Sequence, residues 1–322
     1  MALLVILLLV AGQDSVSHQI PPDSLSWHLL VPDTSTMSRA WEVPRNPESE
    51  APSPDPREAK KILRGFGLFM NTPKESSRFS GGSMTCNNCH PNGGQRERAM
   101  PLVGVHIVFP EYNKRSGRPF TLEERIVGCL LRSVNATGTK QRNVITRHEN
   151  ELAGATLTPE SEEVDALAAY IRWLAAGRAI PRNIPWRGHN SLPASVLLPV
   201  ERLNTKLGKQ LFVENCSSCH ANDGQGKNIG NKRPGPLWGP HSWNDGAGAA
   251  RTYTLAGMIR YWMPYLHPGK LGDEEAQHIA AYITSMPRPR FPFKDKDYLK
   301  EKIPVDAVYY PQLYARNPLR RP

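Results

Sequence analysis

The chain has 322 residues, with 40 Lys and Arg against 30 Asp and Glu, and therefore a formal net charge of +10 at pH 7. This length accommodates two domains of ordinary size, and the positive excess favours an anionic partner, such as a small oxyanion or an acidic protein surface. The sequence contains no basic stripe interleaved with aromatic residues and no nucleic-acid-binding motif, so we expect no nucleic-acid partner.

The N-terminus is a compact apolar run over residues 1–12. The run is short for a bilayer span and resembles the apolar region of a signal peptide, although no Lys or Arg precedes it. We expect residues 1–19 to be a signal peptide or membrane anchor, and the mature protein to be periplasmic. Residues 20–56 form an extension rich in Pro and Ser. Its apolar residues are expected to dock in part on a neighbouring surface: Trp27, Leu29, Leu30, Val31, Trp41 and Val43.

The first strong motif is Cys-Asn-Asn-Cys-His at residues 86–90. Cys-x-x-Cys-His is the attachment signature of a c-type haem, in which Cys86 and Cys89 bond the porphyrin and His90 supplies the proximal iron ligand. A thioredoxin-like redox pair is one alternative, but no βαβ pattern surrounds these residues. A zinc site that adds a distant fourth ligand to the motif is the other.

The same motif returns as Cys216, Cys219 and His220, so we expect two covalently bound haem c groups. The two halves of the chain also repeat each other in order, because a Pro-Leu-x-Gly turn follows each motif. Helical periodicity flanks both motifs over 58–70, 123–131, 161–176, 201–213, 255–261 and 273–286.

Helix, haem motif, Pro-Leu turn and late helix is the order of the small all-α cytochrome c fold, which both halves resemble. In that fold the Pro segment lies over the proximal His, and its carbonyl accepts the imidazole N–H. We therefore predict an all-α protein of two fused cytochrome c-type domains, each with one covalent c-type haem. The predicted divisions are domain 1 over 57–180, a Pro-punctuated linker over 181–199, domain 2 over 200–290 and a C-terminal tail over 291–322.

The distal ligand of the second haem is expected between the Pro-Leu turn and the last helix. Met263 is favoured because Pro264 ends a helix, which lets the thioether project from the turn that follows. Met258 is the alternative, and either methionine is otherwise ordinary core filling. Ligation by His and Met raises the reduction potential, which suits a haem through which electrons leave.

The first half carries Cys129 where the second half offers a methionine. A thiolate ligand lowers the potential of a haem relative to a thioether. Arg125 and Arg132 lie four residues before and three after Cys129, so a helix places all three on one face. Two guanidiniums stabilise a thiolate and hold an anion beside it. A buried, inert cysteine is the alternative, but the flanking arginines favour the ligand.

These residues together resemble the dihaem thiosulfate dehydrogenases of the tetrathionate-forming type, from about residue 65 to about residue 298. The similarity rests first on the motif at 86–90 and on residues 121–133 around Gly128-Cys129. In the second half it rests on residues 236–240, 244–248 and 263–264.

The resemblance implies that the first haem, with Cys129 as its distal ligand, is the active site, and that Arg115, Arg125 and Ser133 bind thiosulfate there. We expect Arg132 to share in this binding. The second haem, with Met263 as distal ligand, is expected to pass electrons to a soluble cytochrome c or similar redox protein. Some relatives offer a Lys before that Met; here Trp262 stands there, so no Lys/Met ligand switch is expected.

The predicted activity is oxidation of two thiosulfates to tetrathionate. Three alternatives stay open at this point. The first is the reverse reaction, in which the same catalyst acts as a tetrathionate reductase. The second is a non-catalytic dihaem electron-transfer subunit, which Leu130 and Leu131 beside the thiol favour. The third is a sulfur-carrier-linked cytochrome that transfers sulfur to a partner's thiol.

Overall fold

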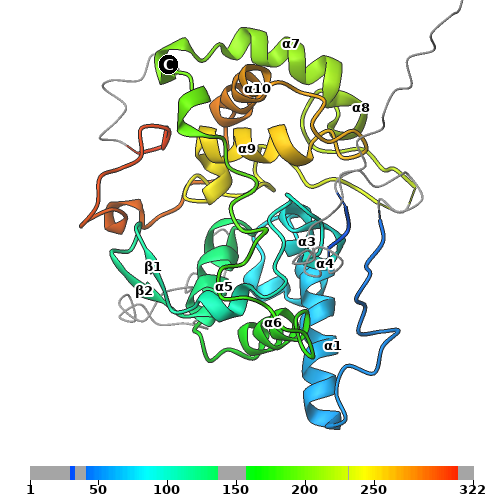
Figure 1. Cartoon of the computed structure of the whole chain (residues 1–322). Helices are drawn as coiled ribbons and strands as arrows, with labels where there is room; N and C mark the ends of the chain where they lie inside the picture. Colours follow the sequence, from blue (N-terminus) through cyan, green and yellow to red (C-terminus); the bar gives the residue numbers. More distant parts are fainter. Residues whose placement is uncertain (1–29, 33–40, 137–156, 231, 311–322) are drawn as a thin grey trace, which may run out of the picture.

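The computed structural model describes residues 30–32, 41–136, 157–230 and 232–310 of the chain (Figure 1). Within these residues, no helix combines the length and the apolar character that crossing a bilayer requires. The expected signal peptide or anchor over 1–19 lies outside them, as do Trp27 and Leu29 of the extension.

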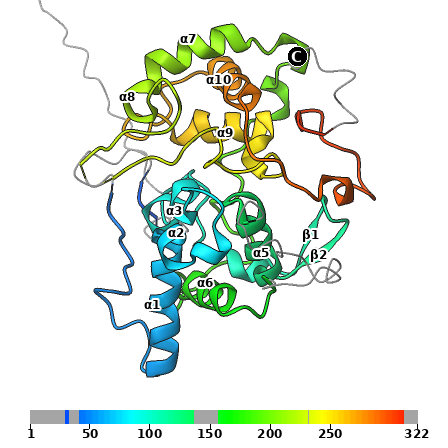
Figure 2. The same ribbon diagram turned by 180° about the vertical axis from the view of Figure 1, so that it is seen from behind.

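The described helices form two bundles, one above the other (Figure 1), and the view from behind shows the same arrangement (Figure 2). The first bundle contains α1 (Pro56–Met70), α2 (Thr72–Glu75), α3 (Cys86–Cys89), α4 (Pro91–Gly94), α5 (Leu122–Arg132) and α6 (Glu162–Trp173). The second contains α7 (Thr205–Asn215), α8 (Ser217–His220), α9 (Thr252–Trp262) and α10 (Asp273–Ser285). The prediction of two helical domains is confirmed.

The β-structure was not predicted. A short antiparallel hairpin joins β1 (Glu111–Asn113) to β2 (Arg118–Phe120) beside α5. A second difference concerns the start of α7, which was predicted at residue 201. The helix begins four residues later because the Asn204 side chain accepts hydrogen bonds from the first backbone N–H groups of α7 and caps it there.

A close helix crossing organises the first bundle. Gly65 of α1 lies so near α6 that a Cβ in its place would come within 1.9 Å of the carbonyl oxygen of Ala166. One turn further along both helices, the rings of Phe69 and Tyr170 are in contact, with their centroids 5.4 Å apart. The crossing therefore depends on a residue without a side chain followed by an aromatic pair.

The second bundle repeats this crossing. A Cβ at Gly208 of α7 would come within 2.0 Å of the carbonyl oxygen of His278 in α10. One turn later, the rings of Phe212 and Tyr282 lie 5.6 Å apart. The glycine and the aromatic pair thus occupy equivalent places in both domains, which supports the internal repeat.

The two bundles meet closely beside the first haem motif. The backbone N–H of Ser83 donates to the carbonyl of His241 at 2.9 Å. A Cβ at Gly235, which precedes the Pro-Leu turn of the second domain, would lie 2.7 Å from the sulfur of Met84 and 3.0 Å from the Oδ1 of Asn88. The proximal segment of the second haem motif therefore lies against the first motif itself.

The ends of the described chain are packed on the bundles. Val31 is fully buried and pairs with Arg96 in a β-bridge, as expected for an extension that docks. The predicted tail is also packed as far as residue 310, since Phe291 and Tyr309 are buried in the main hydrophobic core. In the linker, Trp186 is buried and donates a hydrogen bond to the carbonyl of Val103.

Candidate functional site

The first haem motif lies on the single turn of α3. The Thr85 side chain caps this turn by accepting a hydrogen bond from the backbone N–H of Asn88. Cys86 and Cys89 are free thiols on the turn, and burial raises the pKa of each to about 12. Two neutral thiols side by side, with His90 directly after them, are the arrangement that covalent haem attachment requires.

The imidazole of His90 has a defined orientation. Its Nδ1–H donates to the carbonyl oxygen of Met100 at 2.6 Å, which leaves the lone pair of Nε2 for a metal. Burial lowers the pKa of His90 to about 4, partly opposed by this hydrogen bond and aided by the charge of Arg125. Met100 directly precedes Pro101, so the predicted contact between the Pro segment and the proximal His is confirmed in the first domain. In the second domain the prediction is wrong for the described residues, because none of them pairs with the Nδ1 of His220. These residues fit a c-type haem.

The second motif has the same layout with one difference. Cys216 is the N-cap of α8 and Cys219 lies within it; neither forms a disulfide, and burial raises the pKa of Cys216 to about 12. Burial also lowers the pKa of His220 to about 4, so its imidazole is neutral and able to bind iron. In the described part of the chain, however, the Nδ1 of His220 has no hydrogen-bond partner, unlike that of His90.

Cys129 lies half-buried on α5, near the first haem motif. Cys129 is close enough to Cys86 and Cys89 for a charge on its sulfur to raise the pKa of both, so the three sulfurs lie in one region. A capping box between Thr121 and Glu124 fixes the start of α5 and hence the register of Cys129. The fifth cysteine thus lies in the region of the first haem motif.

The three expected arginines have different surroundings. Arg125 is exposed and forms no ion pair with any described residue, while its charge reaches His90. Arg115 lies in the turn of the β1–β2 hairpin, where its carbonyl accepts a hydrogen bond from the N–H of Tyr298. Burial would lower the pKa of Arg115, but nearby Tyr310, Tyr298 and Asp297 raise it.

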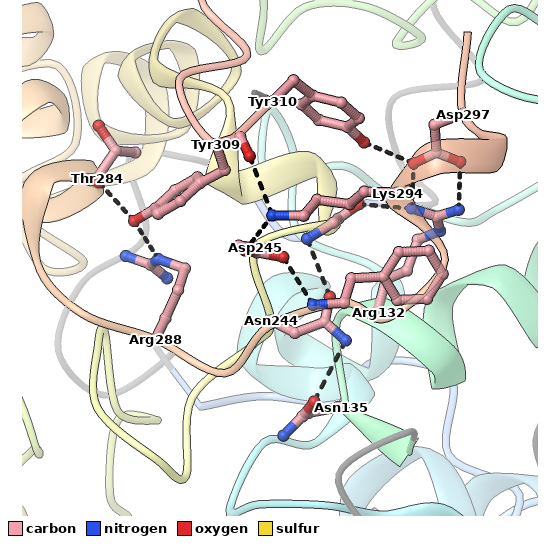
Figure 3. Close-up of polar contacts among 12 residues, drawn as sticks. Arg132, Asn135, Asn244, Asp245, Thr284, Arg288, Lys294, Asp297, Tyr309 and Tyr310 are labelled. Atoms are coloured by element: carbon pink, nitrogen blue, oxygen red, sulfur yellow. Dashed lines mark hydrogen bonds and ion pairs between the residues drawn. The ribbon is translucent and has the colours of Figure 1, made fainter. Parts of the chain in front are cut away.

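Arg132 is held by the C-terminal segment of the second domain (Figure 3). Its two η nitrogens donate to the two carboxylate oxygens of Asp297 at 2.8 and 2.7 Å. One of them also donates to the carbonyl of Gly246, and the guanidinium lies 3.8 Å from the ring centroid of Phe291. The same carboxylate accepts from the Tyr310 hydroxyl at 2.5 Å and lies 3.9 Å from the Nε of Arg115.

Asn244 and its neighbours support the end of α5 from the second domain. The Asn244 side chain donates to the carbonyl of Leu131 at 2.8 Å and to the Oδ1 of Asn135 at 3.2 Å. Its backbone N–H donates to the backbone carbonyl of Arg132. Ser133 caps the helix end, where its N–H donates to the carbonyl of Cys129. The motif around residue 244 therefore holds the helix that carries Cys129.

The two expected methionines differ in position. Met258 lies inside α9 and is buried in the main hydrophobic core. Met263 is the first residue after that helix and is half-buried, so its thioether is not committed to the helix interior. Trp262, directly before it, is buried.

Sequence reasoning missed Asp297 and Tyr310 altogether. Both lie in a segment without periodicity, and nothing in its composition indicates an acidic partner for α5. The residues around Asn244 had a signal, because the string at 244–248 was part of the resemblance, but no role followed from it.

Two cytochrome c-type bundles, each with a complete attachment motif, define a dihaem c-type cytochrome, and the chain carries two covalently bound c-type haems. Family models agree with this division. The model described as "SoxA/TsdA, cytochrome c domain" matches residues 77–180, and the model described as "Cytochrome c" matches residues 205–287.

Curated relatives identify the family more narrowly. The chain is 34% identical over 260 residues to a thiosulfate dehydrogenase of Psychrobacter arcticus, covering 80% of this chain and 72% of that protein. It is 33% identical over 282 residues to a thiosulfate dehydrogenase of Allochromatium vinosum, covering 85% and 95%. The chain belongs to the thiosulfate dehydrogenase family.

A solved structure has the same fold. The thiosulfate dehydrogenase TsdBA from Marichromatium purpuratum matches 85% of this chain with a TM-score of 0.66 at 29% identity. This chain spans about half of that one, since the match covers 53% of it.

Proposed function

We propose that the protein oxidises two thiosulfate ions to tetrathionate at its first haem site. The observation that carries this proposal is the position of Cys129, which lies half-buried on α5 in the region of the first haem motif. A thiolate there would serve both as a second ligand of the haem held by His90 and as a nucleophile. The curated relatives, which are named thiosulfate dehydrogenases, support the choice of substrate.

His90 and Cys129 would hold the first haem, which when bound would supply one-electron redox chemistry. The protein's own contribution is the orientation of these side chains. The Met100 carbonyl orients the His90 ring, and a hydrogen bond of this kind increases the basicity of the other ring nitrogen. A basic imidazole together with a thiolate would favour a low reduction potential of the haem.

The substrate is a dianion, so its binding depends on positive charge. Arg125 is exposed, lacks an ion pair among the described residues and acts on His90, which makes it the arginine best placed to receive sulfonate oxygens. Arg115 and Ser133 complete the binding set. Arg132 is already paired with Asp297, so its role is to hold the end of α5 and not to bind thiosulfate directly.

The reaction proceeds in two steps at Cys129. The thiolate joins the outer sulfur of the first thiosulfate, and the two electrons that formation of this S–S bond releases would be accepted, one at a time, by the bound haems. A second thiosulfate then attacks the sulfur attached to Cys129. Tetrathionate leaves, and the cysteine returns as a thiolate, so charge and electrons balance over the cycle.

The leucines beside the thiol do not oppose an anion site. Leu130 and Leu131 are each only 2% exposed and belong to the main hydrophobic core. Their apolar character is therefore required by packing. The argument from these residues for a non-catalytic electron-transfer subunit loses its basis.

His220 and Met263 would hold the second haem, which would pass the electrons to a soluble cytochrome c or similar acceptor in the periplasm. The close approach of Gly235 to the first haem motif supports transfer between the sites, because short separations favour it. The same residues serve the reverse reaction, and the geometry favours neither direction.

The decisive experiment replaces Cys129 by Ala and by Ser in the holoprotein. Both variants should retain two covalent haems, as measured by haem staining and pyridine haemochrome absorption. They should lose the EPR signature of a thiolate-ligated haem and at least about a thousandfold in thiosulfate turnover. Full turnover by either variant contradicts the covalent step. Initial rates with thiosulfate and with tetrathionate, measured on the wild-type protein, decide the direction.

A further inference from the structure

Tyr265 lies two residues after Met263 and is held by the other domain. Its carbonyl accepts a hydrogen bond from the Nη2 of Arg96 at 2.9 Å, and its hydroxyl donates to the Oδ1 of Asn92 at 2.8 Å. The guanidinium of Arg96 lies 4.0 Å from the centre of the Tyr265 ring. The ring also stacks on Trp41 of the N-terminal extension, at 4.7 Å and an interplanar angle of 16°.

The two residues that hold Tyr265 come from the proximal segment of the first haem. Asn92 and Arg96 follow His90 by two and six residues, and both are buried. Arg96 is fully buried, so its charge is available only to the groups that face it. Tyr265 therefore connects the segment after the proximal ligand of one haem to the segment after the expected distal ligand of the other.

The extension completes this connection. Val31 forms a β-bridge with Arg96, and the carbonyl of Glu42 accepts a hydrogen bond from the side chain of Asn92 at 2.6 Å. The extension thus contacts both residues that hold Tyr265, and through Trp41 it contacts the ring itself. Trp41 remains 39% exposed, an unusual position for a tryptophan unless the stacking contact is what retains it.

A methionine ligand needs such support. The thioether–iron bond is weak, so the polypeptide must hold the sulfur in place, and neighbouring contacts that fix a ligand tune its metal. The segment after α9 runs through half-buried and exposed residues from Met263 to Lys270. Tyr265 is the residue of this segment with contacts on its backbone, its hydroxyl and its ring, which both Arg96 and Trp41 contact.

We propose that Tyr265 is a positioning residue that holds Met263 at the second haem, and that Trp41 and Arg96 set its position. The inference rests on the proposed ligation by Met263. It gives the N-terminal extension a function, because the ligation and potential of the second haem then depend on contacts made by the extension and the first domain.

The test uses the full-length holoprotein with the substitutions Tyr265→Ala, Tyr265→Phe and Trp41→Ala. The readouts are the long-wavelength absorption band of a methionine-ligated ferric haem and the reduction potential of the second haem. Tyr265→Ala should lose most of the band and lower the potential. Tyr265→Phe keeps the ring contacts with Trp41 and Arg96 and should recover most of the band, and Trp41→Ala should lie between the two.

A matched control is Tyr261→Ala, which removes a tyrosine two residues before Met263. Its ring lies 5.8 and 5.5 Å from two arginines and has no hydrogen bond to the first domain among the described residues. It should leave the band unchanged. The EPR signal of the first haem reports in the same samples whether the first domain is intact.

Met263→Leu separates the two proposals. If it abolishes the band while Tyr265→Ala and Trp41→Ala leave both band and potential as in wild type, the positioning role is wrong and the ligand assignment stands. If Met263→Leu leaves the band unchanged, the ligand assignment fails and the positioning role fails with it. Should Tyr265→Ala not fold, Trp41→Ala still decides, since Trp41 is 39% exposed and its removal leaves the core intact.

Discussion

The two carboxylate oxygens of Asp297 accept hydrogen bonds from the two η nitrogens of Arg132, at N···O distances of 2.8 and 2.7 Å (Figure 3). These bonds cross the boundary between the two cytochrome c domains. The two residues are 165 positions apart in the sequence. Since Arg132 ends the helix that carries Cys129, the ion pair connects the packed C-terminal segment to the proposed reaction site. The same carboxylate lies near Arg115, so one acidic side chain faces two of the three arginines expected at the site.

Asp297→Ala should therefore destabilise the protein. The carboxylate side chain is only 4% exposed and that of Arg132 only 14%, and removal of one partner of a buried ion pair costs about 3–5 kcal/mol because the other charge stays buried. The free energy of unfolding, measured with urea and far-UV circular dichroism, should fall by about this amount. Asp165→Ala is the control, because it removes an exposed pair with Lys61 that is worth less than about 1 kcal/mol. Equal losses in the free energy of unfolding for the two substitutions would show that the buried pair with Arg132 contributes no more than an exposed ion pair.

Substitution of the arginines should separate substrate binding from support. Arg125→Ala should raise the KM for thiosulfate by about 10- to 100-fold, since a hydrogen bond to a charged group contributes about 1.5–3 kcal/mol. Arg132→Lys keeps the charge but loses the bidentate hydrogen bonding to Asp297. It should therefore lower the melting temperature, while the KM for thiosulfate stays close to that of wild type. Steady-state kinetics and thermal unfolding of both variants test this assignment. A large rise in KM for Arg132→Lys with an unchanged melting temperature would show that Arg132 binds thiosulfate and does not support the helix.

The two glycines of the 244–248 motif should differ in tolerance. A Cβ at Gly246 would come within 2.7 Å of Phe291 and 2.8 Å of a guanidinium nitrogen of Arg132, whereas a Cβ at Gly248 would meet nothing within 4 Å. Gly246→Ala should destabilise the protein by about 1–3 kcal/mol through overpacking. Gly248→Ala should be close to neutral. Thermal unfolding of the two variants measures the difference, and a neutral Gly246→Ala would mean that Arg132 moves aside without loss.

The parts of the fold that were predicted are those that depend on nearby residues. The haem motifs, the Pro-Leu turns and the helical periodicities are local patterns, and the contact between His90 and Met100 spans only ten positions. Spacing also predicted that Arg125, Cys129 and Arg132 share α5. It did not predict what covers that helix, because periodicity defines a face but not its partner.

The parts that were missed are contacts between distant residues. Asp297 reaches Arg132 over 165 positions and Arg96 reaches Tyr265 over 169, and neither pair has a local signature. The hairpin around Arg115 was missed because its strands have three residues each and one contains Pro119, which weakens any strand pattern. The start of α7 was misplaced because one capping residue, Asn204, outweighs the apolar residues before it.

The repeated glycine at the helix crossings gives a final prediction. Gly208→Ala places a Cβ only 2.0 Å from the carbonyl oxygen of His278. Because this distance is far shorter than van der Waals contact, α7 must move away from α10. The second domain should lose about 1–3 kcal/mol of stability, and more if the aromatic contact between Phe212 and Tyr282 opens with the crossing. Lys209→Ala, on the exposed side of the same helix, is the matched control and should have little effect.

Because the crossing belongs to the second bundle alone, heating should abolish the methionine-ligated haem band at a lower temperature in Gly208→Ala than in wild type. The EPR signal of the first haem should persist to the temperature at which wild type loses it. Simultaneous loss of both signals would show that the two domains unfold as one unit, held together by the contacts of Asp297 and Tyr265.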